Sequence, residues 1–402
     1  MPKFNYKCSL CGKEYDSKSF HYTCQNCGEN GLLDIIYDYD SLKNVWNDKR
    51  FLNSPLRYRN ILPISIDENK LLSYFVGNSP IYRIDKWSKE FSQPNLFLLD
   101  DSRGPTASYK DRASIIAVLK AIELGEKVIT CASTGNAASS LAGACAAFGI
   151  KTYIFVPENA PIGKLVQLIM FGANIFRIKG TYDTAFDLCL EATKEFGWYN
   201  RNTGYNPILL EGKKTSSFEI YEKIGLPDRI YIPVGDGCIY SGIYKGFYDL
   251  KKLGLIDRIP LLIGVQAEGS SPYVKAQKNN FILTPVNAET IADSISVGIP
   301  RVFSQAIRIA KKQKGYFISV TDDEIMAAQS KLAKDSGVFL EPAAAAAAAG
   351  FIKEKSENTI LSNEKVVIIG TGNGLKDTKS VLSRIDLPEP IDPKLSEISK
   401  KI

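Results

Sequence analysis

The chain has 402 residues, of which 45% are hydrophobic and 23% are charged, and its formal net charge is +6. This length allows two domains with buried cores. No apolar run approaches the ~20 residues of a membrane helix, and the lysines are scattered among acidic residues, so we expect neither a membrane nor a nucleic-acid partner. Residues 1–10 lack the apolar core of a signal peptide, so we expect a cytoplasmic protein.

Four cysteines near the start of the chain form two C-x-x-C pairs, Cys8 with Cys11 and Cys24 with Cys27. A glycine that suits a tight turn follows each pair, and four thiolates complete a tetrahedral zinc site. The alternative, two disulfides or free thiols, fits this spacing in a cytoplasmic protein less well. Because four cysteines leave no position for water, we predict a structural zinc ion in a ribbon over residues 1–37.

The only histidine, His21, lies inside this cysteine-rich segment. The rest of the chain therefore has no Ser-His-Asp, Cys-His or multi-histidine site, and general-base chemistry there falls to Lys, Asp, Glu or Tyr. The other cysteines share no spacing and lie in apolar surroundings, so we expect them to be buried and reduced: Cys131, Cys145, Cys189 and Cys238.

Short apolar strands alternate with amphipathic helices after a connecting region of roughly residues 40–95. This alternation predicts a βαβ series, with strands at 127–133, 151–157 and 174–180 and helices at 135–149, 163–172 and 182–197. Later strands predict a second parallel sheet, at 229–234, 260–268 and 365–370. The expected fold class is therefore α/β with two doubly wound parallel-sheet domains, in which ligands bind at the carboxyl ends of strands.

Two later helix starts are marked by their residues. Thr321 and Glu324 have the spacing of a capping box. Pro342 suits a first helical position, so we interpret the seven alanines after it as a helix. The proline-interrupted, charged tail after residue 386 is expected to lie on the surface.

The segment 96–114 predicts a strand, a turn and a helix whose first turn contains Lys110. The positive end of the helix dipole favours a neutral amine, which can act as nucleophile and base. We expect Ser108 to cap this helix, and Asp111 and Arg112 to begin its polar face. On this segment alone, an ordinary solvated lysine is the simpler interpretation.

Three other strand-to-helix turns are rich in small and polar residues. Residues 133–136 present hydroxyls and N–H groups that could cradle a carboxylate. Residues 235–239 could hold a phosphate through backbone N–H groups, provided that Asp236 turns its side chain away. A third glycine-rich turn begins at Thr371. Such turns often bind nothing, so each is weak evidence alone.

The order of these segments resembles that of a known family, the threonine synthase branch of the fold-type II pyridoxal-phosphate enzymes. The similarity runs from about residue 75 to about 380 and is carried by GNSP (77–80), PTASYKDR (105–112), STGNAA (133–138), VGDG (234–237), EPAAA (341–345) and TGNGLKD (371–377). It implies pyridoxal 5'-phosphate as cofactor and a homodimer. It also implies a large catalytic domain begun by residues 38–107 and completed by 206–402, with a small α/β domain at 108–205.

The resemblance further implies roles for individual residues. Lys110 would carry the cofactor covalently, Asn136 would contact its ring oxygen, and Thr371 would contact its pyridine nitrogen. Ser133 and Thr134 would lie near the substrate carboxylate. The cofactor phosphate would be held by backbone groups of Gly235, Asp236, Gly237, Cys238 and Ile239.

Two positions depart from the family pattern. Gly204 and Leu209 stand where threonine synthases usually have a serine and an arginine that bind the phosphate of O-phosphohomoserine. A dianionic leaving group normally needs charge-assisted donors. Lys164, Arg201 or Lys376 could supply that charge, and we favour Lys376 as a substrate-binding residue because it follows the glycines of TGNG.

The sequence thus predicts a pyridoxal-phosphate-dependent carbon–oxygen lyase that converts O-phosphohomoserine and water to threonine and phosphate. Its small-molecule partner would be an amino acid. The nearest alternative is a β-eliminating or β-replacing enzyme acting on serine, threonine or O-phosphoserine, which Leu209 keeps open. A third, less favoured interpretation is a non-catalytic binding protein that uses the zinc ribbon.

Overall fold

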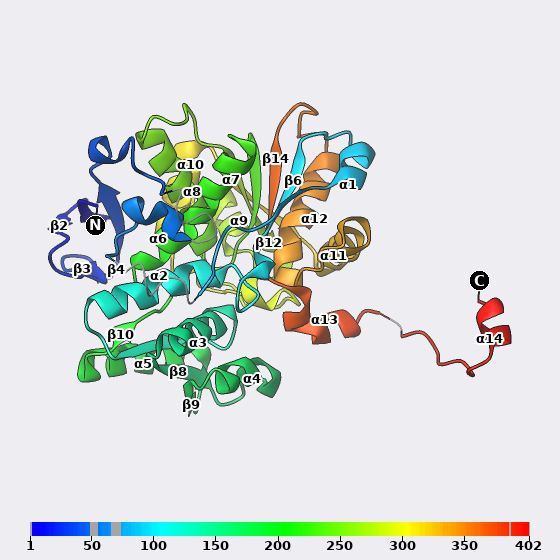
Figure 1. Ribbon diagram of the computed structural model, residues 1–402, viewed down its shortest axis with the longest axis horizontal. Coiled ribbons are helices and arrows are strands. Elements are labelled where there is room, and N and C mark those ends of the chain that lie inside the picture. Colours follow the sequence, from blue (N-terminus) through cyan, green and yellow to red (C-terminus); the bar gives the residue numbers. More distant parts are fainter. Residues whose placement is uncertain (1, 49–54, 66–73, 386, 402) are drawn as a thin grey trace.

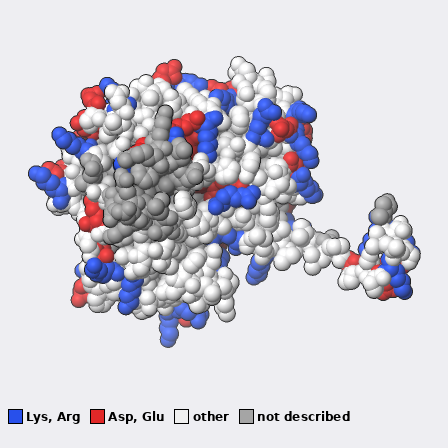
Figure 2. Space-filling view, in the orientation of Figure 1, with Lys and Arg blue, Asp and Glu red and all other residues white. Residues whose placement is uncertain are grey.

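The computed structural model describes residues 2–48, 55–65, 74–385 and 387–401. Parts of the expected connecting region, residues 49–54 and 66–73, lie outside the described residues. The described chain forms three sheets, of four, four and six strands, with helices packed around the two larger ones (Figure 1). Within these ranges, every helix is too short or too polar to cross a bilayer. On the face shown in Figure 2, basic and acidic side chains are interspersed.

The N-terminal sheet is a small antiparallel unit that carries the four N-terminal cysteines. Its strand order is β2-β1-β4-β3. Alternate residues of β1 are buried, as expected for a strand with one face on a core. The sheet lies beside α6, α8 and α10 of the large domain (Figure 1). Its strands are β1 (Phe4–Cys8), β2 (Glu14–Asp16), β3 (Thr23–Cys24) and β4 (Gly28–Tyr37).

The second sheet is wholly parallel and confirms the predicted βαβ series. Its order is β10-β7-β8-β9. Successive residues of β8, such as Ile154 and Phe155, lie in different apolar clusters, because neighbouring side chains point to opposite faces and helices cover both. The elements are β7 (Val128–Ala132), α3 (Asn136–Phe148), β8 (Lys151–Pro157), α4 (Ile162–Met170), β9 (Asn174–Ile178), α5 (Tyr182–Phe196) and β10 (Tyr199–Asn200).

The six-stranded sheet has the order β13-β12-β11-β14-β6-β5. The predicted second parallel sheet is confirmed except at one edge, where β5 pairs antiparallel with β6. The expected connecting region also contains β5 itself and α1 (Asp85–Glu90), whose short spans gave no clear periodicity. The strands are β5 (Ile81–Arg83), β6 (Leu96–Asp100), β11 (Arg229–Pro233), β12 (Leu261–Ala267), β13 (Tyr316–Val320) and β14 (Val366–Gly370).

The alanine run lies inside α12, as predicted, and this helix is buried through most of its length against the sheet. Alanine costs no side-chain entropy and lets a helix approach closely. The two predicted helix starts are confirmed, since α11 has a capping box at Thr321 and Pro342 opens α12. The helices around the sheet are α2 (Lys110–Glu123), α6 (Ile208–Lys213), α7 (Thr215–Ile224), α8 (Cys238–Lys252), α9 (Pro272–Lys278), α10 (Phe303–Gln313), α11 (Asp322–Ser336) and α12 (Pro342–Ser356).

The C-terminal tail extends away from the body of the molecule (Figure 1). It contains α13 (Thr378–Leu382) and α14 (Leu395–Ser399), and neither helix has a buried residue. The four predicted domain ranges stay a prediction. Along the chain, Lys110 and α2 come directly after β6 of the six-stranded sheet and before β7 of the four-stranded parallel sheet.

Candidate functional site

Lys110 begins α2 at the carboxyl end of β14. The N–H of Tyr109 donates to the carbonyl oxygen of Thr371 at 2.9 Å, and Ser108 forms an isolated antiparallel bridge with Gly372. Thr371 directly follows β14. The chain therefore brings Lys110 and Thr371, which are far apart in sequence, to the same strand end, where parallel-sheet enzymes bind their ligands.

The start of α2 differs from its sequence-based description in two ways. Ser108 does not cap the helix. The residue directly before the helix is Tyr109, which is itself in helical conformation, and no side-chain cap is formed. The Ser108 hydroxyl is instead buried without a hydrogen-bond partner. The expected polar face is also wrong, since Asp111 and Arg112 are only 2% and 1% exposed.

Buried partners explain why these charged residues lie inside. Arg112 pairs with Asp101 at 2.7 Å and with Glu219 at 2.7 Å. Asp111 accepts the N–H of Thr106 at 3.0 Å. Both residues therefore fix the turn before Lys110 instead of facing water.

Asn136 and Glu341 meet at the same place from different helices. The side-chain amide of Asn136, at the start of α3, donates to Glu341 at 3.0 Å and to Ser294 at 3.2 Å. Glu341 precedes α12, and a Cβ on Gly372 would lie 2.4 Å from its Oε1, so only glycine allows this approach. Burial raises the pKa of Glu341, although Asn136 and two lysines, Lys376 and Lys110, oppose the rise.

The turn at 235–239 has the open helix start that the predicted anion cradle would need. Gly237 has φ 92° and precedes α8, which begins at Cys238 with no side-chain cap. The first N–H groups of the helix therefore remain available to an anion. The carboxylate of Asp236 accepts the backbone N–H of Arg301 at 3.0 Å. This bond satisfies the Asp236 side chain, which has to turn away if the cradle is to hold an anion.

The environment of the Lys110 amine favours its neutral form. Burial is the main cause and lowers its pKa. Cys238 opposes this change, Arg201 adds to it, and Glu341 and Asp236 oppose it. The direction agrees with the sequence-based expectation, but burial, not the helix dipole, is the leading cause. A neutral amine can serve as nucleophile and base.

The other predicted substrate residues lie on neighbouring turns. Ser133 follows β7 and its hydroxyl accepts the N–H of Gly135 at 3.2 Å, while Thr134 is half-buried beside it. The Lys376 ammonium donates to Thr106 carbonyl oxygen and to Gln167, each at 2.8 Å. Lys376 therefore already has protein acceptors, which the sequence could not reveal.

Lys164, Arg201 and Lys213 differ in how their charges are satisfied. Lys164 pairs with Asp293 at 2.6 Å. Arg201 is buried, and its Nη1 and Nη2 have no hydrogen-bond partner. Lys213, in α6, is likewise buried with an unpartnered Nζ, although no motif in the sequence marked it. Sequence analysis also gave Glu341 no role, although its EPAAA motif was recognised.

The N-terminal cysteines have the geometry of a metal site. Their four Sγ atoms all lie within 4.8 Å of one another, with Cys8 and Cys27 3.9 Å apart and Cys11 and Cys24 3.7 Å apart. A tetrahedron of sulfur ligands around zinc, with bonds of ~2.3 Å, has edges of about 3.8 Å. The sulfur positions therefore fit tetrahedral coordination of a metal ion.

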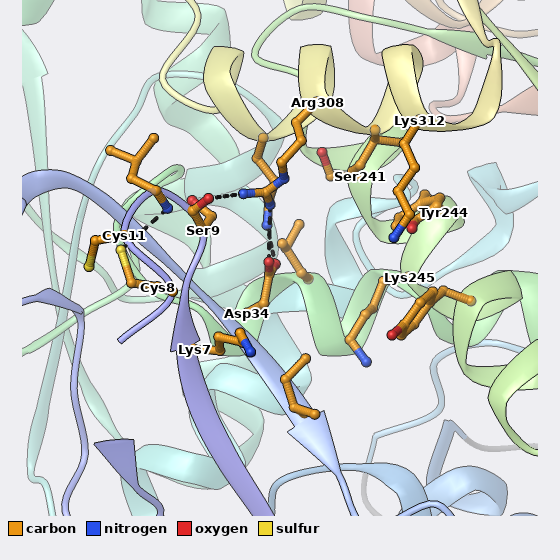
Figure 3. A pocket seen from close by; sticks show the side chains of 17 residues that line it. Lys7, Cys8, Ser9, Cys11, Asp34, Ser241, Tyr244, Lys245, Arg308 and Lys312 are labelled. Atoms are coloured by element: carbon orange, nitrogen blue, oxygen red, sulfur yellow. Dashed lines mark hydrogen bonds and ion pairs between the residues drawn. The ribbon is translucent and has the colours of Figure 1, made fainter. Parts of the chain in front are cut away.

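A pocket of about 440 Å³ lies between the N-terminal sheet, α8 and α10 (Figure 3). Three of its basic side chains are paired, Arg308 with Asp34 at 3.1 Å, Lys7 with Glu14 at 2.9 Å, and Lys245 with Asp249. Lys110 does not line it. We therefore place the candidate site at Lys110, where buried polar groups lack partners.

The residues around Lys110 fit a phosphate-bearing cofactor that reacts with an amine. The uncapped start of α8 offers N–H groups to a phosphate. A Cβ at Gly237 would lie 2.3 Å from Tyr273 Oη, so the cradle requires glycine. Buried polar atoms of Ser108, Arg201 and Lys213 remain without partners in the protein.

Comparisons with known proteins agree with this geometry. A family profile described as "Pyridoxal-phosphate dependent enzyme" matches residues 72–372. The threonine synthase of Methanocaldococcus jannaschii is 38% identical over 96% of each chain, and that of Methanosarcina acetivorans is 38% identical over 99% of this chain and 98% of its own. The structure of a tomato (Solanum lycopersicum) threonine deaminase has the same fold, with a TM-score of 0.66 at 22% identity over 76% of this chain and 88% of that one.

Proposed function

Because this chain belongs to the pyridoxal-phosphate-dependent enzymes and, within them, to the threonine synthases, we propose that its Lys110 site converts O-phosphohomoserine and water to threonine and phosphate. The observation that carries the proposal is the similarity to threonine synthases over nearly the whole chain. The convergence of Lys110, Asn136 and Thr371 on one strand end supports it. The enzyme is a carbon–oxygen lyase.

Several residues would hold the cofactor. Lys110 would bind it covalently through Nζ, and the backbone of residues 235–239 would bind its phosphate. Asn136, oriented by Glu341, would contact the ring oxygen. Thr371 would contact the pyridine nitrogen, and its position is fixed by the hydrogen bond from Tyr109.

Bound pyridoxal phosphate supplies an electron sink that makes the protons beside the amino group of the substrate acidic. Lys110 would move the proton at the α-carbon, because burial keeps a fraction of its amine neutral. Ser133 and Thr134, with the N–H groups at the start of α3, would bind the substrate carboxylate. The phosphate would leave from the γ-carbon, and water would add at the β-carbon.

We also propose that the four N-terminal cysteines bind one structural zinc ion. The fit of the four sulfur atoms to a tetrahedron supports this assignment. The zinc ribbon contacts the large domain through polar side chains, among them Tyr37, whose hydroxyl donates to Glu211, and Asp34, which pairs with Arg308. A closed site of this kind supports structure and not chemistry.

We further propose a cytoplasmic homodimer with the four domain ranges given above, as the family resemblance implies. Light scattering of the purified protein measures the oligomer directly. A monomer of 44.4 kDa at working concentrations would be incompatible with the dimer.

Product analysis tests the reaction. The purified enzyme, supplied with pyridoxal phosphate, is incubated in parallel with O-phosphohomoserine, O-phosphoserine, serine and threonine. We expect threonine from O-phosphohomoserine and no comparable turnover of the others. A keto acid from serine or threonine, without threonine from O-phosphohomoserine, would replace this proposal with the β-eliminating alternative.

A further inference from the structure

Two cationic side chains near Lys110 are buried without a counter-charge. Lys213 is 0% exposed and its Nζ has no hydrogen-bond partner. Arg201, directly after β10, is also 0% exposed; its Nε donates to Ser114 Oγ at 3.2 Å, and its Nη1 and Nη2 have no hydrogen-bond partner. A buried charge that loses its hydration without gaining a partner is strongly destabilising. A folded protein that retains two of them needs a reason.

The groups facing Lys213 do not neutralise it. Burial lowers its pKa to about 7, with Arg201 and Lys110 adding to the effect and Cys238 and Asp236 opposing it. Burial raises the pKa of the Cys238 thiol, which is therefore neutral. The Asp236 carboxylate accepts the N–H of Arg301. The like charge of Arg201 makes the unpaired ammonium still more costly.

The neighbouring lysine shows what a structural ammonium looks like in this fold. Lys214 is also 0% exposed, but its Nζ lies 2.7 Å from Asp249 and beside Glu211. Close carboxylates thus pair with Lys214, just after α6, and none pairs with Lys213 at the end of α6. Lys213 is therefore placed for a partner that the protein itself does not supply.

Lys213 lies between the starts of two helices of the site. Its carbonyl oxygen accepts the hydroxyl of Tyr109 at 2.8 Å, one residue before Lys110. A Cβ on Gly242 of α8 would lie 2.5 Å from the Cβ of Lys213, so α6 packs directly on α8. α8 is 15 residues long and begins without a side-chain cap at Cys238.

The usual phosphate donors of the family are replaced here by residues that cannot serve. Leu209 is 2% exposed in an apolar cluster. Gly204 has φ 68°, and a Cβ there would lie 2.6 Å from the Cβ of Arg301, so a serine would not fit. The positive charge must come from elsewhere.

We propose that Lys213 and Arg201 form a cationic subsite for the phosphate group of a ligand at the Lys110 site. The ligand chemistry is a phosphate monoester dianion, which two cations and open helix N–H groups bind well. The group can belong to the cofactor or to the phosphorylated substrate. The assignment of the Lys110 site rests on the proposed function, but the presence of the subsite can be tested without turnover.

The test uses the full chain with Lys213→Met and Arg201→Met. Lys120→Met is the matched control, because Lys120 is buried but paired with Glu123 at 2.8 Å. Thermal unfolding is followed without cofactor. Fluorescence titration gives the affinities for pyridoxal phosphate and for pyridoxal, which lacks the phosphate. The absorbance of the cofactor-loaded enzyme is titrated with inorganic phosphate.

Four results are expected, of which the first two concern Lys213→Met. Without cofactor the variant unfolds at a higher temperature than the wild type, because an unpaired buried charge is gone. Its affinity for pyridoxal phosphate, for inorganic phosphate or for both falls about tenfold or more, as expected for the loss of a charged hydrogen bond. Lys213→Arg, which keeps the charge, retains more phosphate binding than Lys213→Met. Arg201→Met lowers the same affinity.

The two titrations identify the source of the phosphate. A smaller preference for pyridoxal phosphate over pyridoxal assigns the subsite to the cofactor. An unchanged preference with weaker inorganic phosphate binding assigns it to the substrate. If the affinities of Lys213→Met and Arg201→Met for pyridoxal phosphate and for inorganic phosphate all stay within twofold of the wild type, the proposal is wrong. Because no readout needs threonine formation, failure of the proposed reaction would be seen separately.

Discussion

The hydroxyl of Tyr109 donates a hydrogen bond to the carbonyl oxygen of Lys213 at 2.8 Å. This bond joins the residue before Lys110 to α6. The next residue of the chain, Lys214, lies over the ring of Tyr37 from the N-terminal sheet, with Nζ 4.2 Å from the ring centroid. The four-cysteine sheet is thus linked to Lys110 through α6.

Removing zinc is expected to destabilise the enzyme. Cys8→Ser combined with Cys24→Ser should abolish the single zinc ion per chain and lower the unfolding temperature more than it changes kcat, because the closed site stabilises the fold. Elemental analysis and thermal unfolding measure both effects, with Cys189→Ser as a control outside the cluster. Unchanged zinc content in the double variant would contradict the assignment.

Covalent labelling should identify Lys110 as the cofactor lysine. Borohydride reduction of the loaded enzyme is expected to fix the cofactor on Lys110, because this amine lies at the strand end with a lowered pKa. Peptide mass mapping locates the label. Lys110→Ala should lose turnover, since nucleophile and base are lost together. A label on Lys213 or another lysine would overturn the assignment.

Loss of the Arg112 guanidinium should lower the free energy of unfolding of the enzyme. Arg112→Leu leaves the carboxylates of Asp101 and Glu219 buried without a cation, which costs about 3–5 kcal/mol. Chemical denaturation measures the free energy of unfolding. Arg83→Leu is the control, because Arg83 pairs with Asp85 on the surface and exposed pairs contribute about 1 kcal/mol or less. Equal effects of the two substitutions would be inconsistent with the buried network.

The stability of the cofactor-free enzyme should depend on pH through Lys213. Burial, assisted by the charges of Arg201 and Lys110 and opposed by Cys238 and Asp236, lowers its pKa from 10.5 in the unfolded chain to about 7. The unfolded chain therefore binds more protons between these values, so this lysine makes the fold less stable as pH falls from 10.5 to 7.

The difference between wild type and Lys213→Met isolates this contribution from other titrating groups. The advantage of the variant in unfolding temperature should be largest near pH 7 and should shrink as the pH approaches 10. Thermal unfolding across this range measures it. A difference that is independent of pH would mean that Lys213 keeps its ordinary pKa in the fold.

The sequence predicted the elements with clear periodicity and the turns that follow them. All three strands and helices of the first βαβ series are present, because each carries its own local pattern. β5 was missed, since three residues are too few to show an alternation. The buried position of Arg112 was also missed, because its partner Glu219 is more than a hundred residues away in the chain.

The candidate site shows the same division between local and long-range information. Lys110, Asn136 and Thr371 could be singled out because each lies in a recognisable motif after a strand. Lys213 could not, because it differs from Lys214 only in lacking acidic partners brought by α6 and α8. Burial and pairing depend on tertiary structure, which residue type alone does not specify.

Isotope labelling in water tests the central claim most directly. The enzyme is incubated with O-phosphohomoserine in water enriched in oxygen-18, and threonine and phosphate are analysed by mass spectrometry. A carbon–oxygen lyase that adds water at the β-carbon should give threonine with one labelled oxygen in its hydroxyl group, together with an equal amount of unlabelled phosphate. Labelled phosphate accompanied by homoserine, with no threonine, would contradict the account.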